Sequence, residues 1–412
     1  MVRQTDINKY LLFGASFFAT WGEGMQLVFS KASLMYLVFV LLLLLNNRKL
    51  FFQGSNGPIF TLPKEFKIMM VFIIIHTIIF VFFHLDRFVF EKELLTEDDQ
   101  FTFQTSGTGE ALVRYFIFAA FSVLLSFLIR SEHNLRIFLF GFCCGFIPTL
   151  LGGYSGEYDA LVRFSGGVKD PNIMALDASL VLFFSLFLLK TNKQQLLYKI
   201  ICYSAIIVAL IAVLLSFSRG VMLALVISAI YWLFKQNSFN RILRYIVLVI
   251  GVSVIIYLLL PQEIIDAMRV RFSIKEAEES GGAGRESIWI EYLSHWTDYF
   301  ITGTGLNNCQ SVLVSHNSLE YRVTHNQYLK MFVEFGFLGI LFYLSYFKRL
   351  FKTCHSTVGS YMYLTLPFIA MSVSSFFIQI DGGRSFWIIL AITNYIWFHN
   401  KYGNSIRLSQ MV

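Results

Sequence analysis

About twelve stretches of ~20 apolar residues run through this chain, and they limit its possible folds more than any other feature. Apolar side chains make up 56% of the 412 residues, whereas charged side chains make up only 14%. Soluble domains usually carry ~25% charged residues, so the bilayer is the expected solvent for most of this chain. We therefore predict an all-α, polytopic integral membrane protein of about twelve transmembrane helices. The predicted spans are residues 9–27, 29–46, 68–85, 111–129, 136–152, 173–189, 199–216, 219–234, 243–260, 327–347, 359–380 and 385–399.

The distribution of Lys and Arg predicts the orientation of these spans. Acidic residues on the more basic side are only Asp6, Glu65 and Glu132. By the positive-inside rule, both termini are cytoplasmic and the acid-rich segments 86–110 and 261–326 face outward. More than half of the Lys and Arg residues lie at the two termini and in the connections 46–67, 130–136, 190–199, 235–244 and 348–352.

The predicted organisation has four segments. The first apolar stretch, from Tyr10, is interrupted at Trp21 and lacks a small-residue cleavage pattern, so we interpret it as a retained span rather than a signal peptide. The segments are 1–110, with the N-terminal spans and an acidic outer loop; 111–260, with the central spans and outer loop 152–172; 261–326, the large outer loop; and 327–412, the C-terminal spans.

The large outer loop is long enough to carry short helices. Residues 262–279 have the spacing of an amphipathic helix, and a second helical stretch is expected to start at Arg285 after a Gly-rich segment. Trp289, Leu293 and Trp296 fall at helical spacing in the second stretch. Such a stripe more often marks packing than a sugar-stacking platform, and we favour packing.

Several functional classes find little support in the composition. The five cysteines form no disulfide framework or zinc-ligand spacing, and Cys309 is the one expected to reach the outer compartment. The net charge is +7, and the basic residues that cause it are scattered between the spans. Membrane orientation therefore explains them better than nucleic-acid binding does. The acidic run Glu97, Asp98 and Asp99 offers a metal site or a catalytic base, although a solvated loop is the simpler interpretation.

Four basic or ionisable residues are predicted to meet the outer face: Arg163, Arg219, Arg285 and His325. Guanidinium groups bind phosphate oxygens well, and histidine accepts a proton near neutral pH. A lone Arg at a span end usually extends to lipid phosphate instead. Taken together, the four suit a site that binds a lipid diphosphate and activates an acceptor hydroxyl against the carbon that carries it, which is a glycosyl transfer.

Other residues in these regions have two interpretations each. Glu334 and Asp177 are carboxylates at membrane depth, where such groups are functional or paired, and we favour a structural hydrogen bond to a neighbouring helix for both. Gly166 and Gly167 allow a close approach of the backbone to a ligand or another loop, or serve only a turn. The motif 170–172, Asp-Pro-Asn, suits the start of a helix.

The order of these motifs resembles that of a known family. Arg163 to Asn172 (RFSGGVKDPN) comes first, and the remaining motifs follow in the order Ser218-Arg219-Gly220, Gly284-Arg285 with Trp289, Gly303-Thr304-Gly305, and His325-Asn326 with Leu329, Glu334, Gly336 and Gly339. This order is similar to that of the O-antigen ligase and O-antigen polymerase superfamily of bacterial envelopes. The resemblance covers roughly residues 150–350, whereas the first ~110 residues show only hydropathy.

The resemblance implies a multi-helix, inverting enzyme of the GT-C type that needs no metal and no cofactor. Its donor would be an undecaprenyl-diphosphate-linked oligosaccharide, with Arg219 and Arg285 on the diphosphate and His325 activating the acceptor hydroxyl. Arg163 is a weaker candidate for the same anion. Asn172, Asn326 and Arg322 are further candidates for substrate binding.

The acceptor decides which activity the resemblance implies. A lipid-linked repeat unit would make the protein a polymerase of O-antigen, capsule or exopolysaccharide, which we favour, and a lipid A core would make it a ligase. The expected location is the bacterial cytoplasmic membrane, with the active site facing the periplasm or exterior and with a flippase and a chain-length regulator as possible partners. A lipid-linked glycan flippase or transporter is the alternative from another class, and a metal-dependent glycosyltransferase using residues 97–99 is a third.

Overall fold

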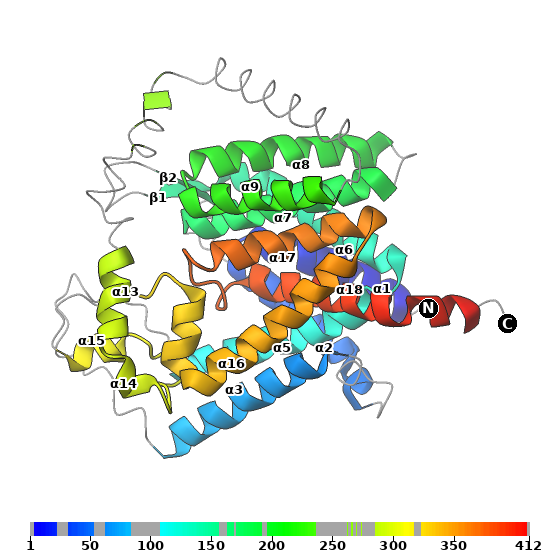
Figure 1. Cartoon of the computed structure of the whole chain (residues 1–412). Helices are drawn as coiled ribbons and strands as arrows, with labels where there is room; N and C mark the ends of the chain where they lie inside the picture. Colours follow the sequence, from blue (N-terminus) through cyan, green and yellow to red (C-terminus); the bar gives the residue numbers. More distant parts are fainter. Residues whose placement is uncertain are drawn as a thin grey trace. The chain divides into compact units, whose positions relative to one another are not determined.

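A computed structural model describes most of the chain, which is predominantly helical and divides into two compact units (Figure 1). The first unit comprises residues 1–39, 136–284 and 358–374, and the second comprises residues 40–135, 285–357 and 375–412. The described residues are 4–22, 32–52, 62–83, 108–155, 163–168, 170–191, 196–235, 285–316 and 323–409, with the single positions 262, 265, 266, 269 and 273.

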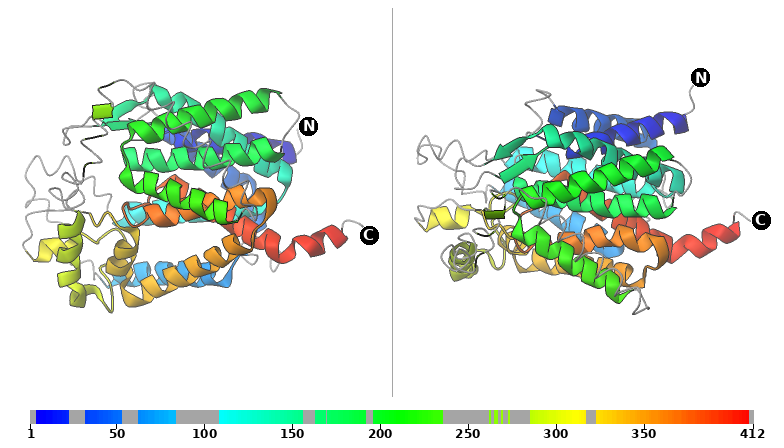
Figure 2. Two further views of the ribbon diagram at one scale, coloured as in Figure 1. Left: turned by 45° about the horizontal axis from the view of Figure 1, so that its top comes forward. Right: turned by 90° about the horizontal axis from the view of Figure 1, so that it is seen from above.

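The first unit is built around a group of packed helices. Helix α7 packs against α8, α9 and α17, and α17 also packs against α9, as the two views of Figure 2 show. The small side chains of Ala224 and Ala370 are fully buried where α9 meets α17, which lets the two helices approach closely. The elements of this unit are α1 (Gln4–Phe17), η1 (Phe18–Thr20), η7 (Ile147–Leu151), β1 (Gly153–Ser155), β2 (Arg163–Gly166), α7 (Pro171–Thr191), α8 (Leu196–Leu215), α9 (Arg219–Phe234), η8 (Gly359–Tyr361) and α17 (Met362–Ser374).

The second unit is organised by its longest helix, α16. This helix runs beside α3 and contacts α18, which in turn packs against α5 (Figure 1). Two helices are shared by the two units, because each has one end in the first unit and the other end in the second: α2 (Ala32–Asn46) and α6 (Glu132–Phe146). The other elements here are η3 (Arg48–Phe52), α3 (Lys64–Phe82), α5 (Thr108–Leu128), α13 (Arg285–Ser294), α14 (Trp296–Tyr299), α15 (Ser311–Ser315), α16 (Gln327–Ser356) and α18 (Arg384–Ser409).

The described helices indicate an integral membrane protein. Many large apolar side chains of α3 are exposed, including Ile68, Val71 and Ile75, and such a surface is stable in lipid rather than in water. The predicted span 243–260 lies outside the described residues, and the total of about twelve stays a prediction. Among the described residues, five stretches are long and apolar enough to cross a membrane: Lys64–Phe82, Glu132–Leu151, Pro171–Thr191, Leu196–Leu215 and Gln327–Ser356; shorter apolar helices cover Leu34–Asn46, Leu112–Leu128 and Arg219–Phe234.

The predicted first span, 9–27, is wrong in its boundaries. Helix α1 starts at Gln4, ends at Phe17, and continues only as a short 3₁₀ turn. The chain then turns because Trp21 Nε1 donates to the carbonyl oxygen of Gly145 at 2.7 Å. The amide of Gly22 also donates to the carbonyl oxygen of Gly167 at 2.5 Å. These long-range bonds end the helix, and its local hydropathy does not reveal them.

The all-α prediction misses a small β-hairpin in the segment 152–172. Strands β1 and β2 pair antiparallel, with Tyr154 opposite Phe164 and Ser155 opposite Arg163. The glycine-rich backbone permits this arrangement, because a Cβ at Gly167 would overlap the carbonyl oxygen of Thr20. Of the two uses considered, the structure therefore shows close approach to another segment of the chain at Gly167, whereas Gly166 has the positive φ of a turn residue, +54°.

Helix α16 is interrupted at Gly336, whose backbone has φ +64°. The segment after α14 fits into this interruption and replaces the lost hydrogen bonds. Thr304 and Gly305 donate their amides to the carbonyl oxygens of Val333 and Glu334, both at 2.9 Å, and Phe337 N donates to Phe300 O at 2.8 Å. A break inside a membrane-spanning helix is tolerated where neighbouring backbone satisfies the freed groups in this way.

Replacing Gly336 with alanine is expected to lower the free energy of unfolding by about 2 kcal/mol or more. The new Cβ would lie 2.8 Å from the carbonyl oxygen of Ile301 and 2.9 Å from that of Phe300, in a backbone conformation that alanine disfavours. Thermal unfolding in detergent, followed by tryptophan fluorescence, measures the loss.

Two glycines serve as controls for this prediction. Gly359 has φ +68°, and a Cβ there would meet no atom of the described residues within 4 Å, so Gly359→Ala isolates the backbone cost. Gly382 does not have positive φ, and a Cβ there would meet no atom of the described residues within 4 Å. Gly382→Ala is therefore expected to change the free energy of unfolding by less than about 0.5 kcal/mol. A Gly336→Ala protein as stable as Gly382→Ala would contradict the proposed fit.

Candidate functional site

Arg163 lies on strand β2 of the first unit and is buried, with 9% of its surface exposed. Its Nε donates to the carbonyl oxygen of Ser216 at 2.8 Å, and its Nη2 donates to Asn172 Oδ1 at 3.1 Å. Ser218 Oγ donates to the same Asn172 oxygen at 2.8 Å. The structure therefore brings Arg163 and Asn172 together with the turn between α8 and α9, which lies 53 residues after Arg163 in the sequence.

Asn172 is tied into this cluster on both sides of its amide. While its oxygen accepts from Arg163 and Ser218, its Nδ2 donates to Asp170 Oδ1 at 3.0 Å. The backbone amide of Asn172 donates to the same Asp170 oxygen at 2.7 Å. These bonds fix the start of α7, as the motif of residues 170–172 predicted, and they hold the guanidinium of Arg163 in place.

Arg219 is the first residue of α9, directly after the hydrogen-bonded Ser218. The turn before it is tight, with Phe217 at φ +49°. The amide of Ser218 donates to Ser216 Oγ at 3.3 Å. A helix N-terminus carries a partial positive charge from its free amides, so the half-buried Arg219 adds a full charge where an anion is already favoured.

Arg285 begins α13 in the second unit, confirming the predicted helical stretch after the Gly-rich segment. One turn later Trp289 packs against a buried cluster and donates its indole Nε1 to the carbonyl oxygen of Thr324 at 2.7 Å. Gln379 Nε2 donates to Thr324 Oγ1 at 2.5 Å. Trp289 is thus a packing and anchoring residue for the segment that precedes His325, whereas Leu293 and Trp296 are about half exposed.

His325 occupies a strained backbone position, with φ +45°. Non-glycine residues seldom adopt this region, and where they do the surrounding structure must hold them there. Both neighbours of His325 are fixed by hydrogen bonds. Thr324 is anchored as described above. Asn326 caps α16, because its side-chain oxygen accepts hydrogen bonds from the amides of Tyr328 and Leu329 at 3.0 and 3.1 Å. The cap gives Asn326 a structural role that sequence reasoning did not assign.

The first turn of α16 is also attached to the turn before α18. Gln327 N donates to Ser375 O at 2.7 Å, and Gln327 Oε1 accepts from the amides of Ile380 and Asp381 at 2.9 and 3.2 Å. Gln327 itself is fully buried. His325 therefore directly precedes a helical turn that is hydrogen-bonded to backbone 53 and 54 residues further along the chain.

Glu334 and Lys330 form a buried charged group with Asp381. Lys330 Nζ lies 2.9 Å from Asp381 Oδ1 and 3.7 Å from Glu334 Oε1, and Tyr115 OH donates to Asp381 Oδ2 at 3.2 Å. Both carboxylate oxygens of Glu334 are buried and accept no hydrogen bond from the described residues. Among the described residues, Glu334 is thus paired with Lys330 on its own helix, rather than by a hydrogen bond to a neighbouring helix as predicted.

Lys330 and Asp381 were missed by the sequence reasoning. The available signal was the spacing of four residues between Lys330 and Glu334, which places opposite charges on one helix face inside a span. A cavity of about 40 Å³, with both polar and apolar lining residues, opens beside the pair and is large enough for a few water molecules or a hydroxyl group. Its lining consists of Arg114, Tyr115, Phe118, Leu306, Asn307, Lys330, Asp381 and Gly382.

Comparison with known families addresses the central part of the chain. Residues 204–344 match the model of the O-antigen ligase family. The match confirms the resemblance to the O-antigen ligase and O-antigen polymerase superfamily, and it supports a function in polysaccharide assembly by an enzyme acting on lipid-linked glycans. A comparison with curated proteins finds no match.

The stretch similar to the O-antigen ligase family contains Arg219, Arg285 and His325, but neither Arg163 nor Asn172. It also contains Glu334 and Gly336, so the break in α16 lies within it. Asp177, outside it, is buried in α7 with 2% of its surface exposed.

Besides the span 243–260, three sequence predictions fall on residues that the structure does not describe. They concern Arg322, the acidic run of residues 97–99, and most of the amphipathic helix 262–279. Cys309, by contrast, is described and buried against Tyr292 and Val312. Burial raises the pKa of the Cys309 thiol to about 12, so it behaves as a core side chain at neutral pH.

Proposed function

We propose that this protein is a glycosyltransferase that moves an undecaprenyl-diphosphate-linked glycan at the outer face of the bacterial cytoplasmic membrane. The observation that carries the proposal is the family match, because the matched stretch contains Arg219, Arg285 and His325 together. The anchored, strained position of His325 supports it further, since strain of this kind persists at functional sites.

In the proposed step, an acceptor hydroxyl attacks the anomeric carbon of the donor sugar, and His325 takes up the hydroxyl proton. The bond from that carbon to the diphosphate oxygen breaks, and undecaprenyl diphosphate leaves with the electron pair. Arg219 and Arg285 would stabilise the charge on the leaving diphosphate, and such electrostatic help is usually the largest contribution to catalysis. Attack opposite the leaving group inverts the configuration at the carbon.

The favoured acceptor is a second lipid-linked repeat unit, which makes the protein a polymerase of O-antigen, capsule or exopolysaccharide. The donor would reach the outer face through a flippase, and a separate regulator would set the chain length. Transfer to a lipid A core or another lipid acceptor, the activity of a ligase, uses the same chemistry. Both versions place both termini in the cytoplasm.

Complementation tests the proposal and separates the two acceptors. A strain lacking the gene receives the wild-type protein or the alanine variant of Arg219, Arg285 or His325, and the surface glycan is resolved on a gel with membrane levels of each protein checked. If the variants reach the membrane but glycan collapses to one repeat unit on its normal anchor, the protein is a polymerase. Full-length polymer retained on undecaprenyl diphosphate identifies a ligase. Wild-type ladders from all three variants would reject the site.

A further inference from the structure

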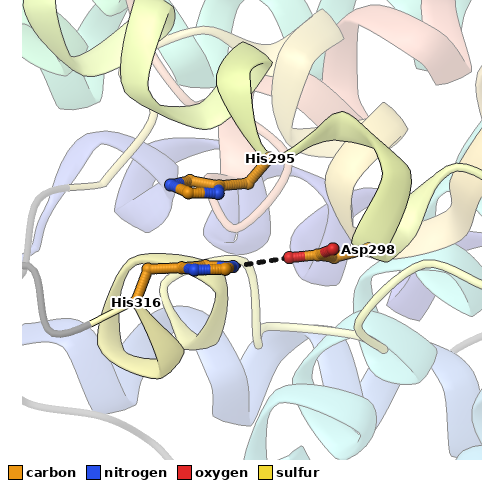
Figure 3. Close-up of side chains that lie close together, drawn as sticks. All are labelled: His295, Asp298 and His316. Atoms are coloured by element: carbon orange, nitrogen blue, oxygen red, sulfur yellow. Dashed lines mark hydrogen bonds and ion pairs between the residues drawn. The ribbon is translucent and has the colours of Figure 1, made fainter.

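A cluster of side chains of the metal-ligating type lies in the large outer loop, and it includes none of the residues proposed for catalysis. His295 sits between α13 and α14, Asp298 is in α14, and His316 directly follows α15 (Figure 3). Asp298 Oδ2 and His316 Nε2 are 2.6 Å apart, and the rings of His295 and His316 stack with centroids 3.6 Å apart. In the described part of the chain, one ligand atom from each residue lies within 4.8 Å of the other two.

These separations are close to those of a metal site. Zinc bonds of ~2.0–2.1 Å in a tetrahedral arrangement place ligand atoms about 3.3 Å apart. The contact between Asp298 and His316 must therefore open slightly to admit an ion. The ring of His295 must turn out of the stack, because a metal binds in the plane of an imidazole. Rotation about the last side-chain bond of histidine has a broad energy minimum, so this movement costs little.

The helices that carry the three residues are fixed by a packed core. Tyr292 and Tyr299 are fully buried beneath them, and Tyr299 OH donates to the carbonyl oxygen of Tyr292 at 2.8 Å. Val312 of α15 belongs to the same hydrophobic cluster. The backbone positions of the three ligands are thus set by buried contacts, and only the side chains need to move.

The chemistry of the three ligands selects the ion. Two imidazole nitrogens and one carboxylate oxygen suit zinc, whereas calcium and magnesium prefer sites made of oxygen alone. The side chains of Asp298 and His316 are 45% and 39% exposed, which leaves room for water in a fourth position.

We propose that His295, Asp298 and His316 bind a zinc ion that ties α14 to the end of α15. The ion would close the segment 295–316, which includes the Gly303 to Gly305 turn seated in the break of α16. Its expected effect is therefore on the stability of the outer loop. The site takes no part in the proposed glycosyl transfer, which uses none of these three residues.

Zinc binding is measured on the full-length, tag-free protein in detergent after treatment with chelator. Equilibrium dialysis against zinc chloride with metal analysis is expected to show one zinc ion bound per chain, and zinc is expected to raise the thermal unfolding midpoint by binding the folded state. The double variant His295→Ala/His316→Ala and the milder Asp298→Asn are expected to weaken the affinity at least ~100-fold. His355→Ala, which removes an exposed histidine at the other end of α16, is expected to bind like the wild type.

Two results would overturn the proposal. One is equal zinc binding by the wild type and Asp298→Asn, which would place the ion elsewhere. The other is a wild-type protein that binds no zinc, or whose unfolding midpoint zinc leaves unchanged, which would leave the cluster as an ordinary surface pair of His316 and Asp298. Asp298→Asn keeps the size of the side chain, so it decides the matter even if the double variant does not fold. Loss of glycan transfer in the catalytic variants is a separate measurement, so either proposal can fail alone.

Discussion

Replacing His325 with asparagine is expected to slow glycan transfer by ~10²–10⁴-fold while leaving the protein folded and in the membrane. Asparagine is chosen because it tolerates the left-handed backbone region, and His325 has φ +45°. The carboxamide cannot accept the proton of the acceptor hydroxyl at neutral pH, so only the chemistry is removed. The rate is measured as glycan formed per unit of membrane protein in isolated membranes.

Comparison with a second substitution separates chemistry from backbone strain. His325→Ala also lacks the proton acceptor, but alanine is disfavoured at positive φ and should lower stability by about 1–2 kcal/mol as well. The control His355→Asn changes an exposed histidine at the far end of α16 and should keep full activity. If His325→Asn retains near wild-type activity, His325 is a structural residue, and the proposed general base is wrong.

Replacing Arg285 or Arg219 with alanine is expected to reduce transfer by ~10²–10³-fold each, because each would remove a cation from the leaving diphosphate. Lysine should restore only part of the rate at either position, since an ammonium lacks the planar fork that binds two phosphate oxygens. The rate is followed as release of undecaprenyl diphosphate at saturating donor.

The outer loop itself offers a matched control for the arginine variants. Arg269 is exposed, and its Nη1 lies 3.4 Å from Asp266 Oδ1, so Arg269→Ala removes the same charge from the same loop while keeping every residue of the proposed site. It should transfer glycan at the wild-type rate. Equal losses for Arg269→Ala and Arg285→Ala would mean that net charge, rather than a diphosphate site, controls the activity.

The helices of this protein could be predicted from sequence because apolar runs report burial in lipid directly. The start of α13 at Arg285 and the start of α7 after Asp170 were also readable, since caps and turn residues act locally. Helix boundaries that depend on partners distant in the sequence could not be predicted. The early end of α1 depends on bonds from residues 21 and 22 to Gly145 and Gly167.

In the candidate site, too, local features could be predicted from the sequence and long-range contacts could not. The basic residues could be identified individually, because each lies at or between apolar stretches of the sequence. Their supports could not, since Arg163 is held by Ser216 and Asn172 through side-chain geometry that spacing does not encode. Pairing of Lys330 with Asp381 spans 51 residues and likewise has no local pattern.

The most direct test of the account uses the purified protein in a lipid bilayer with lipid-linked glycan on its outer side. Undecaprenyl diphosphate and elongated glycan are measured together, for the wild type, Arg285→Ala and Arg269→Ala. We expect that each transfer releases one undecaprenyl diphosphate, that Arg269→Ala matches the wild type, and that Arg285→Ala releases almost none. A wild-type protein that carries the donor across the bilayer without releasing undecaprenyl diphosphate would contradict it and identify a transporter.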